Sequence, residues 1–177
     1  MKRSDLEHII RASSAIAGDN EIIAIGSQAI LGQFPHAPAE LLRSLELDVF
    51  PKNKPERSIV IDGAIGEQSV FHHTFGYYAH GVSAETAILP RGWESRLIPV
   101  QNENTQGATG WCVEAHDLAI SKLVAGREKD HQFVAALLKH RMVQKPLLGE
   151  RLESVDLDAQ RKAELRQRLG RWIVESN

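Results

Sequence analysis

Hydrophobic residues recur at helical spacing near the start of the chain and again over its last third. Residues 4–17 are predicted to form a helix that begins with a capping box, Ser4-x-x-Glu7, and ends at a glycine. A further helix over about 56–65 is expected after Pro55, because proline is favoured at the first helical position. The same spacing predicts later helices over 115–125, 128–140 and 158–174.

Strand patterns fall between these helices. Residues 21–25 form a short apolar run typical of a buried strand, whereas residues 45–50 alternate strictly between the two faces of a strand. The histidine- and aromatic-rich residues 71–81 fit no regular pattern. Further strands are predicted over 82–89 and 94–100, paired as a hairpin around Pro90-Arg91-Gly92, and over 111–113.

This layout predicts an α+β protein with two parts. The first part, residues 1–113, holds the strands and is a mixed α/β core. The second part, residues 114–177, is all helical and is expected to pack on the core within a single structural unit. A chain of 177 residues is long enough to bury one hydrophobic core.

Composition narrows the classes of function. The formal net charge is -2, so the whole molecule lacks the basic character of many nucleic-acid-binding proteins. The single cysteine, Cys112, excludes an internal disulfide and suits a reducing compartment. No apolar run approaches the roughly 20 residues needed to span a bilayer, and no signal-peptide pattern is present. We therefore expect a cytoplasmic protein that has no membrane partner.

Two short motifs could carry chemistry. Gly26-Ser27 follows the first strand, where a glycine turn, a helix start and a hydroxyl would suit a phosphate. Glu46 and Asp48 lie two apart on the next strand, so both point to one face and a divalent cation would relieve their repulsion. Each motif also has a plainer interpretation, because most Gly-Ser pairs are only turns and most acidic strand faces are only solvated.

Both motifs resemble those of known nucleotidyltransferases. Residues 22–31 (IIAIGSQAIL) and 44–50 (SLELDVF) resemble the first motif of nucleotidyltransferase-fold proteins, in which Gly-Ser or Gly-Gly precedes an acidic pair on the next strand. Residues 117–130 (DLAISKLVAGREKD) resemble the signature of the AbiEii-type nucleotidyltransferase toxins and their relatives. The resemblance implies a nucleotidyltransferase-like mixed β-sheet flanked by helices, with a C-terminal helical part.

The resemblance also implies a role for each matching residue. Gly26 and Ser27 would hold a nucleoside triphosphate, and Glu46 and Asp48 would ligate Mg²⁺ as catalytic acids. In the second motif Lys122 would contact phosphate as a catalytic and nucleotide-binding residue, and Asp130 would be a further catalytic acid. Glu46 departs from the pattern, which usually has aspartate there. The third carboxylate of many members is not identifiable, and Glu85 and Glu94 are only candidates for it.

Other residues with functional side chains have plainer interpretations. Lys122 lies on an apolar helix, where a lysine either extends to water or meets an anion. His72 and His73, with His80 nearby, lack the spacing of a zinc site, so we expect structural or surface roles for them.

Three functions are compatible with these observations. The first is metal-dependent transfer of a nucleoside monophosphate from a triphosphate to an RNA or protein acceptor. The second is an inactive relative of the same fold that binds a nucleotide or a partner protein. The third is a component of a toxin–antitoxin or defence module, as relatives of this kind often are.

Overall fold

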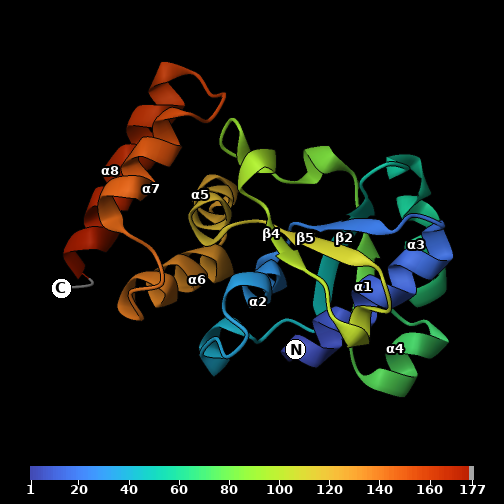
Figure 1. Ribbon diagram of the computed structural model, residues 1–177. Helices are drawn as coiled ribbons and strands as arrows, with labels where there is room; N and C mark the ends of the chain where they lie inside the picture. Colours follow the sequence, from blue (N-terminus) through green and yellow to red (C-terminus); the bar gives the residue numbers. More distant parts are fainter. Residues whose placement is uncertain (176–177) are drawn as a thin grey trace. The chain divides into compact units, whose positions relative to one another are not determined.

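The computed structural model describes residues 1–175, with side chains described to residue 172 (Figure 1). The chain divides into two compact units. The sheet unit comprises residues 1–87 and 97–114, and the helical unit comprises residues 88–96 together with the chain from residue 115 onwards. Residues 88–96, which belong to the helical unit, therefore interrupt the sequence of the sheet unit.

One mixed five-stranded sheet forms the centre of the sheet unit. Its strands lie in the order β3-β2-β1-β5-β4. The pairs β1–β5 and β2–β3 are parallel, whereas β1–β2 and β4–β5 are antiparallel. The strands are β1 (Glu21–Ala24), β2 (Glu46–Pro51), β3 (Tyr78–Gly81), β4 (Ile98–Val100) and β5 (Thr109–Cys112).

The structure confirms three of the predicted strands and contradicts the predicted hairpin. Strands β1, β2 and β5 lie within a residue or two of their expected positions. Residues 82–89 contain only a 3₁₀ turn, Ala84–Thr86, and β4 pairs with β5 instead of a strand before it. The segment around Pro90 belongs to the helical unit, where Arg96 binds Asp117 through two hydrogen bonds of 2.8 and 3.0 Å. That ion pair gives the segment a partner that strand propensity does not reveal.

Four α-helices complete the sheet unit, all of whose residues the structure describes. The first, α1, has a fully buried face formed by Leu6, Ile9 and Ile10. The predicted capping box at Ser4 is wrong, because the helix begins at Arg3 and the Asp5 carboxylate accepts a hydrogen bond of 2.7 Å from the Lys2 amide. These helices are α1 (Arg3–Ala17), α2 (Ile30–Gln33), α3 (Ser58–Ile65) and α4 (Val70–Phe75).

The helical unit contains four α-helices in the described residues. Three of them match the predicted helices closely, whereas α7 was not predicted. Pro146 lies in its first turn, where proline is tolerated, but Gly149 lowers its helix propensity. Leu148 and Leu152 are nevertheless fully buried, so packing of this apolar face outweighs the weak propensity. The helices are α5 (Ala115–Ala125), α6 (Glu128–Lys139), α7 (Lys145–Glu153) and α8 (Ala159–Glu175).

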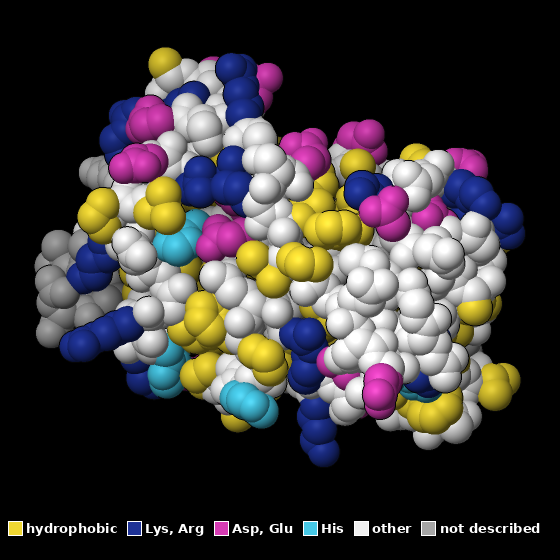
Figure 2. Space-filling view, in the orientation of Figure 1, with side chains coloured by type: hydrophobic (Ala, Val, Ile, Leu, Met, Phe, Trp, Pro, Cys, Tyr) yellow, Lys and Arg dark blue, Asp and Glu magenta, His cyan; other side chains and the backbone are white. Residues whose placement is uncertain are grey.

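Helix composition and surface charge both bear on the possible partners of the protein. In the described part of the chain, no helix combines the length and the apolar character that crossing a bilayer requires. Figure 2 shows acidic and basic side chains interspersed on the face that it displays. That pattern agrees with the near-neutral charge of the sequence.

Candidate functional site

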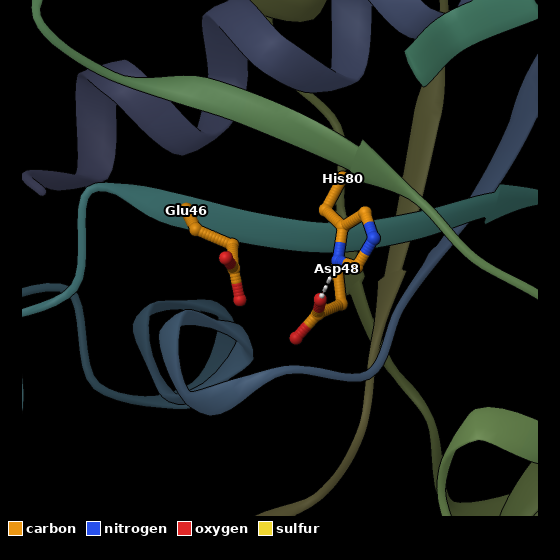
Figure 3. A group of neighbouring side chains, drawn as sticks. All are labelled: Glu46, Asp48 and His80. Carbon is orange, nitrogen blue, oxygen red and sulfur yellow. Dashed lines mark hydrogen bonds and ion pairs between the residues drawn. The ribbon is translucent and has the colours of Figure 1, made fainter. Parts of the chain in front are cut away.

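Strand β2 places two carboxylates on one face of the sheet. Glu46 and Asp48 are half-buried, whereas Leu47 and Val49 between and beyond them are fully buried. This alternation follows from the two-residue period of a strand. Figure 3 shows the Glu46 and Asp48 side chains projecting from β2 in the same direction, as the sequence predicted.

Strand β3 supplies a partner for each carboxylate. The parallel pairing aligns Tyr78 with Glu46 and His80 with Asp48. The Tyr78 hydroxyl donates a hydrogen bond of 3.0 Å to Glu46 Oε2, and His80 Nδ1 lies 3.0 Å from Asp48 Oδ1. Figure 3 shows the His80 ring directed at the Asp48 carboxylate. The two acids are therefore held from the neighbouring strand.

Tyr78 is a hydrogen-bond donor at neutral pH and well above it. Burial, followed by the hydrogen bond to Glu46 and the negative charge of that carboxylate, raises the pKa of Tyr78 to about 12. The phenol therefore keeps its proton and fixes one oxygen of Glu46. The second carboxylate oxygen of Glu46, Oε1, is then the one that can bind a ligand on the face that Glu46 shares with Asp48.

The glycine turn lies directly against Asp48. The Ile25 amide donates to the Asp48 carbonyl oxygen at 3.0 Å, and Gly26 follows at once. A Cβ placed on Gly26 would collide with Asp48 Oδ2 and would lie 2.9 Å from Asp48 Cγ. Gly26 has φ -78° and ψ 179°, which other residues adopt, so the position needs glycine for space and not for its backbone angles.

Ser27 begins the short helical segment that the sequence predicted. Gly26 is the capping position, and a 3₁₀ turn, Ser27–Ala29, leads into α2, which ends at Gln33. Two such short segments have only a weak dipole, so the electrostatic part of the sequence argument for phosphate binding loses weight. The close approach of the turn to Asp48 carries more.

The residues that meet here fit a divalent cation. One ligand atom each from Glu46, Asp48 and His80 lies within 4.8 Å of the other two. Two carboxylate oxygens suit Mg²⁺ or Mn²⁺, and an imidazole nitrogen adds a donor that later first-row metals favour. Among the described residues, neither Glu85 nor Glu94 joins this group, and Glu94 belongs to the helical unit.

Comparison with known proteins identifies the family. A family model described as a nucleotidyltransferase of unknown function, DUF6036, matches residues 4–172. The chain belongs to this nucleotidyltransferase family. No curated protein and no solved structure is significantly similar to the chain.

Membership of the DUF6036 family supports the general class that the motifs indicated. The mixed sheet flanked by helices is the α+β, nucleotidyltransferase-like fold expected from the resemblance. The match is to nucleotidyltransferases in general and not to the AbiEii-type toxins specifically.

The second motif of this DUF6036 protein belongs to the helical unit, whereas Gly26, Glu46 and Asp48 belong to the sheet unit. Lys122 Nζ is 3.6 Å from Asp130 Oδ1, and Arg127 Nε donates to Asp130 Oδ2 at 2.7 Å. Burial raises the pKa of Asp130, but hydrogen bonds from Arg127 and the Lys122 charge outweigh it and leave that pKa lowered. Of the two interpretations left open for Lys122, it meets an anion.

Sequence reasoning missed the contribution of β3 to the site. Tyr78 and His80 are spaced by two, which is also the spacing of Glu46 and Asp48. That shared spacing is the signal that could have matched the two pairs. The histidine pattern instead groups His80 with the adjacent pair His72 and His73. His72 accepts a hydrogen bond of 3.1 Å from the Gln68 amide and stabilises a turn.

Proposed function

We propose that this protein is a metal-dependent nucleotidyltransferase that transfers a nucleoside monophosphate from a triphosphate to an RNA or protein acceptor. The observation that carries the proposal is the packing of the Gly26 turn directly against the Asp48 carboxylate, beside Glu46. A triphosphate on the turn would then lie beside the two carboxylates. Family membership supports the same class of reaction.

The four site residues of the sheet unit each have a role in this proposal. Glu46 and Asp48 would hold Mg²⁺, which when bound neutralises charge on the triphosphate. The backbone of Gly26 and the hydroxyl of Ser27 would orient the phosphates. The acceptor hydroxyl would form a bond to the α-phosphorus, pyrophosphate would leave from the opposite side, and the hydroxyl proton would pass to solvent. Catalysis would consist mainly of positioning and charge stabilisation.

Lys122 and Asp130 enter the proposal only through the resemblance, which gives them phosphate contact and a further acidic role. Within the helical unit they already bind each other. Lys122→Ala separates the two roles. A loss of triphosphate binding with little change in the unfolding temperature supports phosphate contact, whereas a loss of stability alone supports an internal ion pair.

A thermal-shift titration tests the proposal. Each of the four ribonucleoside triphosphates is added to the full chain with Mg²⁺, and at least one is expected to raise the unfolding temperature. Asp48→Asn should abolish the shift, whereas Glu56→Gln, which removes an exposed carboxylate from the same unit, should leave it unchanged. The absence of a shift with all four nucleotides would refute nucleotide binding.

A binding protein without turnover is the second candidate. Two features favour it. Glu46 stands where the resembling proteins usually have aspartate, and the residue opposite Asp48 on the neighbouring strand is His80 and not a carboxylate. Incubation with α-labelled triphosphates and a total RNA or protein extract distinguishes the candidates. Label on an acceptor supports transfer, and a thermal shift without labelling supports binding alone.

A relationship to the AbiEii-type toxins is the finer part of the proposal. It rests on residues 117–130 and implies a toxin–antitoxin or defence module with a partner protein. Induced expression in a bacterial host should arrest growth, and Asp48→Asn should relieve the arrest. Arrest that persists in this variant would mean that nucleotidyl transfer is not its cause.

A further inference from the structure

His80 presents a nitrogen donor to the two carboxylates of β2. Its Nδ1 atom, and not the far side of the ring, is the atom aimed at Asp48 Oδ1. The His80 side chain is 48% exposed, so the hydrogen bond between these two groups gains little from burial. Packing therefore does not require a histidine at this position.

The distance between these two atoms suits a shared cation as well as the hydrogen bond that joins them. Two ligand atoms bound at right angles to one cation, each at about 2.1 Å, lie about 3.0 Å apart. His80 Nδ1 and Asp48 Oδ1 are 3.0 Å apart already. Glu46 offers an oxygen within 4.8 Å of both atoms, so all three side chains present a ligand atom to the same small region.

We propose that His80 Nδ1 is the third protein ligand of the site, and that it makes the site prefer Mn²⁺ to Mg²⁺. Imidazole binds first-row transition metals well and Mg²⁺ poorly, whereas carboxylates alone accept both. The inference rests on the proposed function in so far as the same two carboxylates hold the metal. Metal binding by these side chains can nevertheless be measured without any nucleotide.

Coordination requires a free lone pair on Nδ1. A coordinating imidazole would carry its proton on Nε2, and any proton on Nδ1 would be released to solvent. His80 and Asp48 would then both hold the cation in place of the hydrogen bond between them. Tyr78 continues to hold the second oxygen of Glu46 in this arrangement.

The test uses the full-length chain with MnCl₂ alone. Electron spin echo spectroscopy of bound Mn²⁺ detects a directly coordinated ¹⁴N nucleus, and labelling histidine with ¹⁵N should change the modulation. His80→Asn retains a hydrogen-bond donor beside Asp48 but removes the imidazole. This variant should lose the nitrogen signal and bind Mn²⁺ at least about tenfold more weakly.

Two further variants complete the design. His73→Ala removes an exposed histidine from α4 of the same unit and should leave both the signal and the affinity unchanged. His80→Asp creates an all-oxygen site, so the ratio of the Mg²⁺ and Mn²⁺ dissociation constants should fall severalfold. A ratio equal to that of the unmodified chain would contradict the assigned preference.

The outcomes separate this inference from the proposed function. Bound Mn²⁺ without a nitrogen signal would overturn the assignment of His80 and leave nucleotidyl transfer intact. A nitrogen signal that depends on His80, together with no thermal shift by any triphosphate, would support the metal site and refute the proposed function. Failure of Mn²⁺ to bind to the unmodified chain would also overturn the inference.

Discussion

Replacement of Gly26 by alanine tests the contact on which the site depends. The added methyl group would collide with Asp48 Oδ2 and would lie 2.9 Å from Cγ and 3.1 Å from Cβ of Asp48. Because the backbone angles of Gly26 suit alanine, the cost comes from this collision and not from backbone strain. The Asp48 side chain must therefore turn away, which also breaks its contact with His80.

The size of the effect follows from the burial of Asp48. Overpacking costs about 1–3 kcal/mol. The Asp48 side chain is 20% exposed and can move partly toward solvent, so we expect a loss near the lower end, about 1–2 kcal/mol. A chain of this size loses roughly 2–4 °C per kcal/mol, so the unfolding temperature should fall by roughly 2–8 °C. Binding of Mn²⁺ should weaken as well.

A double-mutant cycle isolates the contact. In a protein that already carries Asp48→Ala, the methyl group added by Gly26→Ala contacts only Cβ of residue 48, at 3.1 Å. The cost of Gly26→Ala should therefore fall to near zero. Measured against Asp48→Asn, which keeps the size of the side chain but removes its charge, the cost should persist. Urea unfolding gives the three values. An equal cost of Gly26→Ala in all three backgrounds would refute the proposed packing of the turn against Asp48.

Three further predictions concern other contacts. Tyr78→Phe should weaken Mn²⁺ binding about tenfold in a titration, because Glu46 loses the donor that orients it, and an unchanged affinity would show that this orientation is unimportant. Asp117→Asn should cost about 2–4 kcal/mol in urea unfolding, because the fully buried carboxylate binds two arginines. Asp156→Asn, which removes an exposed ion pair, is its control and should cost little. The pKa of Glu7 is raised by burial but lowered further by hydrogen bonds from two asparagines and an arginine, so its net pKa lies below 4.5. Its contribution to stability is therefore present above pH 4.5 and lost as the pH falls through the lower folded pKa, and Glu7→Gln should flatten that loss in thermal unfolding from pH 7 to pH 3.

Local signals in the sequence were sufficient for much of the fold. Helix α5 has the predicted bounds, since its apolar face is continuous and Gly126 follows its last residue. The paired carboxylates at Glu46 and Asp48 also followed from strand alternation alone. These features depend on residues that are close together in the sequence, so the sequence alone is enough to predict them.

Features that depend on distant residues could not be predicted in the same way. The local pattern around Pro90 predicts a hairpin, because the residue that Arg96 binds, Asp117, lies 21 residues further along the chain. Likewise, the space that Gly26 provides is filled by Asp48, a residue of another strand. A glycine at this turn suggests phosphate binding. In the structure, however, the position needs glycine because the Asp48 carboxylate leaves no room for a Cβ.

The register between β2 and β3 links the hydrophobic core to the chemistry of the site. Leu47 pairs with Ala79, and both are fully buried, whereas the residues on either side of each form the polar face. A shift of one residue would place Ala79 beside Asp48 and would move His80 to the core face, at the cost of burying its polar ring. The packing of two apolar side chains therefore determines which groups meet the carboxylates. Because this selection is made by the core, substitutions at Ala79 should disturb metal binding even though the residue faces away from the site.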